Sequence, residues 1–366
     1  MKILQIVKSR NLAGSEQYML TLCRLLQRRG HTCYVAIKRG GRLEEACREQ
    51  GLTVAPLSLD KPFAAFRLRK WAQQQGVEIV HCHLTGAARI GMKVAFPLEI
   101  PCVSHLHIYR DDVAYKRVAY YRKGLLIAVA NHIGRYYEEK FTLQRGRVPT
   151  VLNATVAHEQ PDAQRSREEL RAEMLQELSL PEDSRLLLLV GRLSSGKAQD
   201  ILIQALPPIL ARHPNTHVLL AGVAKAGTNV EQELRTLVGQ LDVKDHVHFL
   251  GFRKDLARLT RAADLHLVPS RFDVLPLVVV EGMMLGAGVL ASSVGGIPEI
   301  IEDGKTGFLV PPEDVGALAA RINALLDEPE RVRQVGEQAQ AYAQSELSPD
   351  AMAAKVEKYY ECLQRA

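Results

Sequence analysis

One stretch organises the second half of this 366-residue chain, and it reads Val268-Pro269-Ser270-Arg271-Phe272-Asp273-Val274-Leu275-Pro276-Leu277. An apolar run ends at the Pro-Ser turn, a loop carrying Asp273 follows, and a second carboxylate, Glu281, comes at the start of a predicted helix. A strand, a loop and a helix N-terminus present backbone N–H groups and a helix dipole to an anionic ligand. The two carboxylates are predicted to accept hydrogen bonds from hydroxyls, as a sugar offers; the alternative is that they are ordinary solvated charges.

Length and composition predict two globular domains in a reducing compartment. A chain of 366 residues exceeds one ordinary hydrophobic core. Apolar residues make up 47% and charged residues 24%, and no apolar run is long enough for a transmembrane helix. The first apolar run is too short for a signal peptide. The six cysteines show no CxxC pairing, which favours a cytoplasmic location.

Positive charge is concentrated in the first half of the chain. Residues 1–160 contain 25 Lys and Arg against 12 Asp and Glu, whereas the net charge of the whole chain is +6. This asymmetry indicates an anionic partner on that side. Nucleic acid is not expected, because aromatic residues are only 5% and no nucleic-acid motif is present. A peripheral contact with an anionic membrane or a phosphorylated glycolipid fits better, and the alternative is a solvated face.

Apolar strands alternate with helical patterns along both halves, which predicts parallel, doubly wound α/β sheets. In the first half, Arg147–Asn153 is predicted as the last strand. A polar stretch after residue 156 then predicts the linker, so the domain boundary is placed at 163/164. In the second half, the continuously apolar Leu186–Val190 is typical of a buried parallel strand.

The loop after Leu186–Val190 carries two cations, in the sequence Gly191-Arg192-Leu193-Ser194-Ser195-Gly196-Lys197. An arginine offers a planar fork and a lysine a point charge, a combination that suits a diphosphate. The alternative is a solvated loop. Near the N-terminus, a strand at residues 2–7 leads through Gly14 and Glu16 into another helix. That is also a phosphate-binding layout, although the GxGxxG fingerprint of dinucleotide sites is absent.

Two His-x-His pairs lie on predicted strands, and within each pair the side chains share a face. The residues concerned are His81, His83, His105 and His107, with Asp111 and Asp112 as the only nearby carboxylates. Three interpretations stay open: a zinc or iron site, histidines buried in the core, or residues of a catalytic cleft at the carboxyl ends of the strands.

The stretch from Gly191 to Glu299, with its Gly-Arg-Leu loop, its paired carboxylates and its closing Gly295-Gly296-Ile297-Pro298-Glu299, resembles the donor-binding signature of glycosyltransferase family 4. The resemblance extends over nearly the whole chain. It implies a GT-B fold, with two Rossmann-like domains facing across a cleft. The implied domains are an acceptor-side domain at 1–163, onto which a helix at about 350–366 packs back, and a donor-binding domain at 164–349.

The resemblance also implies roles for single residues. Arg192 and Lys197 hold the pyrophosphate, Glu281 accepts from the ribose, and Asp273 meets a hydroxyl of the donor sugar. The implied catalytic residues are His107, Asp273, Arg192 and Lys197. The implied donor-binding residues are Gly14, Arg192, Lys197, Phe252, Asp273, Val274, Leu275, Leu277 and Glu281. The acceptor-side candidates are Glu16, His105, Tyr109 and Lys116.

The implied reaction is retaining, metal-independent transfer of a sugar from a UDP- or GDP-linked donor, without a cofactor, to a glycan or glycolipid of lipopolysaccharide or another cell-envelope polymer. This chain departs from the family pattern at Ala13 and Ala198, which replace glycines, and at Asp273, which replaces a glutamate. The alternatives are a nucleotide-sugar epimerase or sugar phosphorylase of the same fold, a metal-dependent hydrolase using the histidines, and a non-catalytic sugar-nucleotide-binding module.

Overall fold

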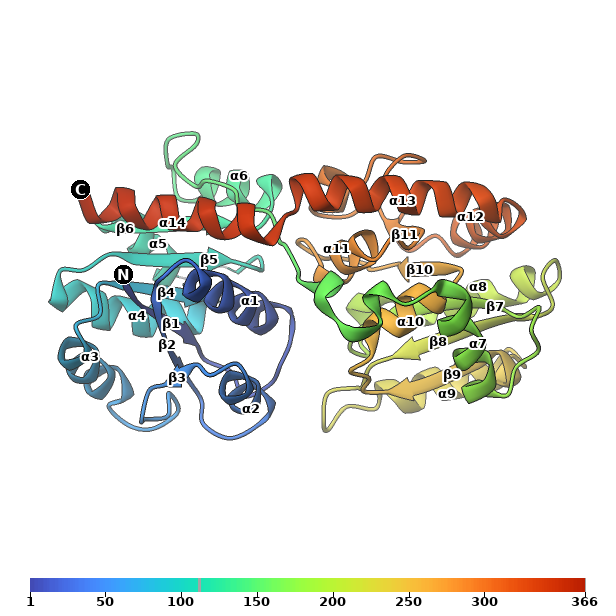
Figure 1. The fold of residues 1–366 in the computed structure, drawn as a ribbon, viewed down its shortest axis with the longest axis horizontal. Helices are drawn as coiled ribbons and strands as arrows, with labels where there is room; N and C mark the ends of the chain where they lie inside the picture. Colours follow the sequence, from blue (N-terminus) through green and yellow to red (C-terminus); the bar gives the residue numbers. More distant parts are fainter. Residues whose placement is uncertain (111–112, 366) are drawn as a thin grey trace. The chain divides into compact units, whose positions relative to one another are not determined.

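The computed structural model describes residues 1–110 and 113–365, and in this part of the chain it contains two six-stranded parallel sheets (Figure 1). Their strand orders are β3-β2-β1-β4-β5-β6 and β12-β11-β10-β7-β8-β9. The prediction of two doubly wound parallel sheets is therefore confirmed. The chain divides into two compact units: Met1–Ala154 with the segment from Leu347 onwards, and Thr155–Glu346.

The first unit alternates strands and helices and ends with the C-terminal helix. Its elements are β1 (Lys2–Val7), α1 (Gly14–Arg28), β2 (Thr32–Ile37), α2 (Arg42–Glu49), β3 (Thr53–Val54), α3 (Ala64–Gln75), β4 (Ile79–His83), α4 (Thr85–Leu98), β5 (Cys102–Leu106), α5 (Val113–Tyr120), β6 (Gly124–Ala128), α6 (Asn131–Lys140) and α14 (Pro349–Arg365).

The second unit follows the same plan, with short 3-10 turns between some elements. Its strands are β7 (Arg185–Val190), β8 (Thr216–Ala221), β9 (Val247–Gly251), β10 (Leu265–Val268), β11 (Val289–Ser292) and β12 (Phe308–Val310). Its helices are α7 (Arg167–Leu178), α8 (Gln199–Leu210), α9 (Val230–Gln240), α10 (Leu256–Ala262), α11 (Leu277–Met284), α12 (Val315–Asp327) and α13 (Pro329–Glu346). Its 3-10 turns are η1 (Ala157–Glu159), η2 (Pro161–Gln164), η3 (Ser195–Lys197), η4 (Lys244–His246) and η5 (Ile297–Glu299).

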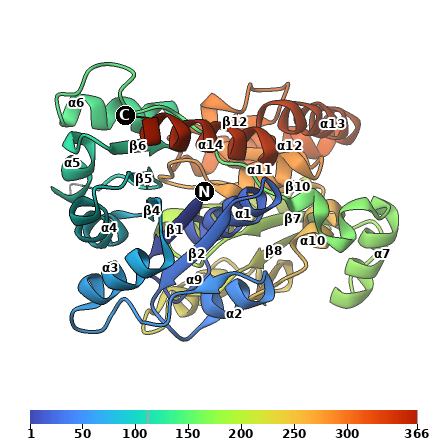
Figure 2. The ribbon, with the colours of Figure 1, turned by 60° about the vertical axis from the view of Figure 1, so that its left-hand side comes forward.

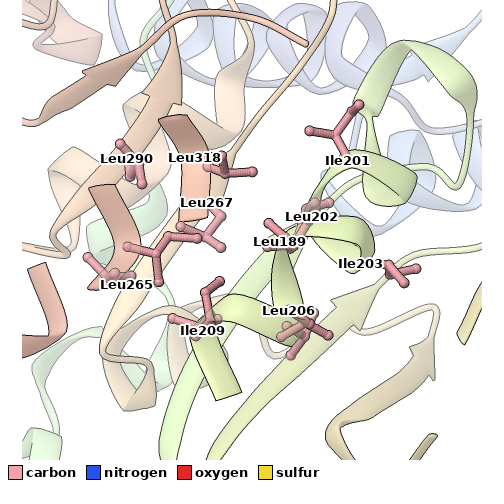
Figure 3. Packing of buried hydrophobic residues seen from close by; sticks show 14 of the residues in the cluster. Leu189, Ile201, Leu202, Ile203, Leu206, Ile209, Leu265, Leu267, Leu290 and Leu318 are labelled. Carbon is pink, nitrogen blue, oxygen red and sulfur yellow. The ribbon is translucent and has the colours of Figure 1, made fainter. Parts of the chain in front are cut away.

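Strand β7 shows why a continuously apolar run forms a central parallel strand. Leu187 and Leu189 point into one hydrophobic cluster, which includes helix α8. Leu186 and Leu188 point the other way, into a cluster with helices α7 and α10. Because side chains alternate along a strand, helices on both faces require apolar residues at every position. Figure 3 shows Leu189 packed with Leu202 of α8 in this core.

Both sheets have the strand order 3-2-1-4-5-6 when numbered within their own unit. In such a sheet the chain winds outwards in both directions from its centre, so the loops that follow the two central strands diverge and leave a crevice. The central pairs are β1 with β4 in the first unit and β7 with β10 in the second. Ligand sites are therefore expected at the carboxyl ends of these strands.

Two boundaries differ from the sequence prediction. Arg147–Asn153 is not a strand: only Thr150 forms an isolated bridge, to Ala128, because Pro149 has no N–H with which to continue a ladder. The division between the units lies at Ala154, not at residue 163. The intervening turns η1 and η2 pack on the second unit, where Ala157 and Ala163 cluster with Ala257 and Leu285.

Helix α14, red in Figures 1 and 2, packs against the first unit. Val356 and Tyr360 are fully buried in the same hydrophobic cluster as Tyr18 of α1. At the edge of this contact, the carboxylate of Glu357 lies 2.5 Å from Arg29 and 2.6 Å from His31. The end of the chain is thus part of the core of the unit that contains its beginning.

Candidate functional site

Two loops meet at the central strand pair of the second sheet. The loop after β7 contributes Lys197, and the loop after β10 contributes Asp273. The ammonium of Lys197 lies 2.6 Å from a carboxylate oxygen of Asp273, and both side chains keep about a quarter of their surface exposed, 25% and 22%. The structure therefore brings together a cation and a carboxylate that lie far apart in the sequence, at the position where the strand order predicts a ligand.

Arg271 ties the same two loops together, and sequence reasoning assigned it no role. Its guanidinium binds both carboxylate oxygens of Asp200, at 2.8 and 2.6 Å, and donates to the carbonyl of Ser195. Its backbone N–H donates to the carbonyl of Gly196. Desolvation alone would raise the pKa of Asp200, but the hydrogen bond and charge of Arg271 lower it overall. Asp200 thus stays ionised, and the pair fixes the Lys197 loop against the Asp273 loop.

Gly295 allows a third segment to approach this site. It has a φ of +55°, and a Cβ at this position would lie 1.9 Å from the carbonyl oxygen of Asp273. The neighbouring Gly296 N–H donates to the carbonyl of Val274 at 2.6 Å. The Gly-Gly turn after β11 therefore sets the backbone of Asp273-Val274, because only glycine leaves room for so close a contact.

Arg192 follows strand β7 and Phe252 follows β9, and β8 lies between these two strands. Arg192 is exposed, while its backbone carbonyl accepts from Gln199 Nε2 at 3.0 Å. Between these strands, Gly222 lets the chain after β8 approach so closely that a Cβ there would lie 1.9 Å from the carbonyl oxygen of Gly191. Phe252 is 43% exposed after the end of β9. The loops of all these strands lie at the same edge of the parallel sheet as Lys197 and Asp273.

Helix α11 begins at Leu277, so the predicted donors Val274 and Leu275 belong to the loop before it and Leu277 to its first turn. Glu281 lies in the second turn of this helix and is only partly exposed. Burial raises the pKa of Glu281 to about 7. A carboxylate in this environment lacks part of its hydration, so hydroxyl donors from a ligand would stabilise its ionised form.

In the first unit, Gly14 and Glu16 occupy the first turn of α1, directly after the loop that follows β1. Glu16 is buried, with 4% of its surface exposed, and accepts a hydrogen bond from Ser15 Oγ at 2.9 Å. Two residues further on, Tyr18 lies with its ring centroid 4.6 Å from that of His105 and 5.1 Å from that of His107. Helix α1 thus lies directly over the histidines of β5.

The four histidines form a connected, buried group under α1 and α14. His83 Nε2 lies 2.8 Å from Gln5 Oε1, and since a carbonyl oxygen only accepts, His83 carries its proton on Nε2. His83 Nδ1 then accepts from His107 Nε2, 3.1 Å away. A second hydrogen bond joins His81 Nε2 to His105 Nδ1 at 3.1 Å, and His81 Nδ1 contacts the hydroxyl of Tyr360.

Burial keeps this cluster neutral. It lowers the pKa values of His81 and His107 to about 3, and it lowers those of His83 and His105 well below their usual range. His105 is fully buried inside the cluster, so it packs as a core residue and not as an open acceptor contact. His107, after the end of β5, is only partly buried. Of the four histidines, His107 is therefore the most accessible to solvent.

The histidines bond to one another and to Gln5 and Tyr360 in the described structure. Within residues 1–110 and 113–365, no group of three or more His, Cys, Asp or Glu side chains has the arrangement needed to hold a metal ion. Asp111 and Asp112, the carboxylates considered for such a site, lie outside the described residues.

Of the remaining acceptor-side candidates, Tyr109 lies after the end of β5 and Lys116 lies on α5. Tyr109 is 46% exposed and packs edge-on against Tyr136 of α6, with centroids 4.9 Å apart. Lys116 is exposed on α5, with its ammonium 6.0 Å from the ring of Tyr120. Tyr115, which the sequence places in the same basic, tyrosine-rich stretch, is fully buried and packs on Tyr137.

Two doubly wound parallel sheets, with a cation-bearing loop after the central strand β7 of the second, are typical of two-domain, nucleotide-binding α/β proteins. Comparison with known proteins specifies the family. Residues 12–156 match the family described as Glycosyltransferase Family 4, and residues 171–342 match the family described as Glycosyl transferases group 1. The chain belongs to these family 4 glycosyltransferases, and its fold is of the GT-B type.

Curated relatives share this family. Spore coat protein SA of Bacillus subtilis is 32% identical over 250 residues, which cover 64% of this chain and 64% of the relative. The chain thus spans just under two thirds of that relative's length. A D-inositol 3-phosphate glycosyltransferase of Streptomyces scabiei is 28% identical over 301 residues, which cover 77% of this chain and 67% of the relative.

Solved structures share the whole fold at low identity. Anabaena Alr3699/HepE, crystallised with UDP and glucose, has a TM-score of 0.86 and 22% identity, covering 99% of this chain and 100% of that one. WaaG, a glycosyltransferase involved in lipopolysaccharide biosynthesis, has a TM-score of 0.72 and 18% identity, covering 97% and 99%. These similarities show the GT-B fold.

Proposed function

We propose that this protein transfers a sugar from a nucleotide-diphosphate sugar to an acceptor hydroxyl with retention of anomeric configuration, and that the second unit binds the donor. The observation that carries the proposal is the placement of Lys197 and Asp273 at 2.6 Å from each other at the switch point of the second sheet. A cation can bind the diphosphate, and a carboxylate beside it can accept a hydrogen bond from a hydroxyl of the attached sugar.

The leaving nucleoside diphosphate develops negative charge, which preorganised positive groups stabilise. In this proposal Lys197 and Arg192 contact the diphosphate, and the start of α11 contributes backbone N–H groups from Val274, Leu275 and Leu277. No metal ion is needed for that role, so chelators should leave transfer unchanged. Pro276 lacks an N–H and cannot join this set.

The family resemblance supports the remaining donor contacts in this proposal. Glu281 accepts from the ribose hydroxyls, Asp273 accepts from a sugar hydroxyl, and the backbone at Phe252 frames the base. From the first unit, Gly14 and the neutral imidazole of His107 meet the sugar. A phosphate oxygen of the donor takes the proton of the attacking hydroxyl, which then adds on the face that the diphosphate leaves.

The proposed donor is UDP- or GDP-linked; a UDP complex of a protein with the same fold supports the former. The proposed acceptor is a glycan or glycolipid of the cell envelope, either neutral or phosphorylated. A protein of the same fold involved in lipopolysaccharide biosynthesis supports the glycolipid class, and a relative named for D-inositol 3-phosphate supports a phosphorylated acceptor. Because a glycolipid acceptor lies in a membrane, the proposal includes a cytoplasmic protein that contacts an anionic membrane surface. Among the described residues, no helix is long and apolar enough to span a bilayer.

The test is the release of nucleoside diphosphate from a panel of nucleotide sugars, measured with and without a lipid-linked or phosphorylated glycan acceptor. Transfer predicts release that requires the acceptor and a product of retained configuration by NMR. Conversion of the sugar without an acceptor would instead identify an epimerase, and dependence on inorganic phosphate a phosphorylase. Donor binding without turnover under any acceptor would leave only a binding module.

A further inference from the structure

The first unit carries a groove that the proposed reaction does not use. It lies among helices α3, α4 and α5, whose ribbons neighbour one another in Figure 2. The groove has a volume of about 1530 Å³. Helix α4 packs on the sheet with α3 and α5 beside it, and its Gly91 faces Val80, Cys82 and Cys102. The alternate strand residues Ile79 and Val103 instead cluster with Tyr18 of α1 and Tyr360 of α14, so α4 covers the opposite face of the sheet. The groove is therefore on a different surface from the histidine cluster.

Large apolar side chains are exposed around this groove. Phe66 of α3 is 58% exposed, Phe96 of α4 61%, Val113 of α5 64% and Tyr120 59%. These are four of the ten exposed large hydrophobic residues within the described ranges, and they all line one groove. Single exposed apolar residues are ordinary, but a group of them around one depression marks an interaction surface.

Cations surround the same apolar residues. Among the residues that the structure describes, six cations line the groove, Arg69, Arg89, Lys93, Arg117, Arg122 and Lys123, together with one carboxylate, Glu99. The guanidinium of Arg69 lies 5.2 Å from the ring centroid of Phe66, so cation and aromatic ring occupy adjacent positions. The charge surplus of the first half of the chain is therefore partly gathered on this surface.

We infer that the surface of α3, α4 and α5 around this groove docks on an anionic lipid bilayer. The exposed apolar side chains around the groove insert at the boundary between the headgroups and the acyl chains. Each Lys or Arg near an anionic leaflet adds to the attraction, and apolar insertion together with a basic patch gives stable yet reversible binding. The inference rests on the proposed function in one respect: a protein docked on the membrane by this surface would be close to a glycolipid acceptor in that membrane.

Charge decides against another copy of this chain as the partner. A symmetric dimer through this groove would place the six cations of one molecule against those of its partner, which is unfavourable. An anionic bilayer is complementary to the cations, and it also accepts the four apolar side chains.

The test is co-sedimentation with vesicles of phosphatidylcholine alone or mixed with phosphatidylglycerol. The wild type should bind the mixed vesicles and should bind pure phosphatidylcholine poorly. Its binding to the mixed vesicles should weaken as the salt concentration is raised. The charge-reversed pair Lys93→Glu with Arg117→Glu should weaken binding at least about tenfold, and Phe66→Ser with Phe96→Ser should also weaken it. Lys244→Glu, a single charge reversal at an exposed site of the second unit, is the control, and it should bind nearly as well as the wild type does.

Equal binding of wild type and charge-reversed pair would overturn the inference, as would equal binding to both vesicle types. An oligomer that dissociates in the Phe66→Ser, Phe96→Ser variant would overturn it in favour of self-association. All four changes are at exposed or half-buried surface positions, and an unchanged melting temperature verifies folding. Donor-induced stabilisation should be the same in every variant. Absence of vesicle binding, with donor binding present, would contradict the docking surface and leave the proposed function intact. Absence of donor binding in the wild type, with vesicle binding present, would contradict the proposed function and leave the docking surface intact.

Discussion

The ammonium of Lys197 and the carboxylate of Asp273 form an ion pair of 2.6 Å between the loops that follow β7 and β10. In the proposed donor complex, Lys197 contacts the diphosphate and Asp273 a sugar hydroxyl. The pair then holds each side chain in place before the donor arrives. The positive charge of Lys197 also offsets the repulsion between the Asp273 carboxylate and the two phosphates of the donor.

Removal of either partner should therefore have different consequences. Lys197→Met removes a charge-assisted contact to phosphate and leaves Asp273 facing the diphosphate, so donor affinity should fall at least about tenfold. Asp273→Asn keeps the lysine, and it should weaken the binding of a nucleotide sugar more than the binding of the free nucleoside diphosphate. Calorimetric titration of both ligands measures this, with Lys244→Met as the control for loss of one positive charge. Equal losses for both ligands in Asp273→Asn would remove Asp273 from sugar recognition.

Gly295→Ala should disturb the donor loop at a distance from any proposed ligand contact. A Cβ at residue 295 meets the Asp273 carbonyl at 1.9 Å, so the loop must shift. Gly227→Ala is the matched control, since it also has a positive φ, +79°, but nothing lies within 4 Å of its added Cβ. Both changes strain the backbone by about 1 kcal/mol, yet only Gly295→Ala should abolish donor-induced stabilisation in a thermal-shift experiment. Normal donor binding by Gly295→Ala would show that the Asp273-Val274 backbone plays no part.

Much of this arrangement could be predicted from sequence because it depends on local patterns. The apolar run of β7, the turn at Pro269-Ser270 and the cations of the following loop are all contiguous. The link made by Arg271 was not predictable, since its partner Asp200 lies on α8 and an arginine in a loop is ordinarily solvated. The strand predicted at Arg147–Asn153 was wrong because apolar composition outweighed the missing N–H of Pro149.

The histidine pairs show the same limit. Period-two spacing correctly placed His81 with His83 on one face, but a zinc site, a core position and a cleft position give the same pattern. Tyr18 and Tyr360, from helices near opposite ends of the chain, decide the environment by covering the group. No local signal in the sequence joins Tyr360 to β4.

Glu281 should make both stability and donor affinity depend on pH. Its pKa is about 7 in the folded protein against 4.5 as the ordinary value, so the folded state binds more protons between these values and stability falls as pH rises through this interval. Glu281→Gln should remove this dependence, gaining about 2–3 kcal/mol relative to wild type between pH 5 and pH 8. Urea unfolding at both pH values measures the difference. The donor affinity of the wild type should rise as pH increases through 7. If the stabilities of wild type and Glu281→Gln changed in parallel with pH, the raised pKa of Glu281 would be contradicted.

The histidine cluster should destabilise the protein in mild acid. His81 and His107 have pKa values of about 3 when folded against 6.5 ordinarily, so the unfolded state takes up protons first as pH falls below 6.5. Each contributes a loss of up to about 1.4 kcal/mol per pH unit. Unfolding between pH 7 and pH 5.5, in a Glu281→Gln background that removes the opposing titration, measures the slope. His107→Gln should lower this slope by the amount that corresponds to about one proton fewer taken up on unfolding. An unchanged slope would mean that His107 titrates in the folded protein as it does in solvent.

The most direct test of the donor site is a thermal-shift panel of UDP-, GDP- and ADP-linked sugars on wild type and Glu281→Ala. Ligand binding to the folded state raises the melting temperature by mass action and ranks the donors. At least one nucleotide sugar should stabilise the wild type at a concentration that leaves Glu281→Ala unshifted, while Lys244→Met responds normally. The account is contradicted if no nucleotide sugar stabilises the wild type, or if Glu281→Ala shows the full wild-type shift.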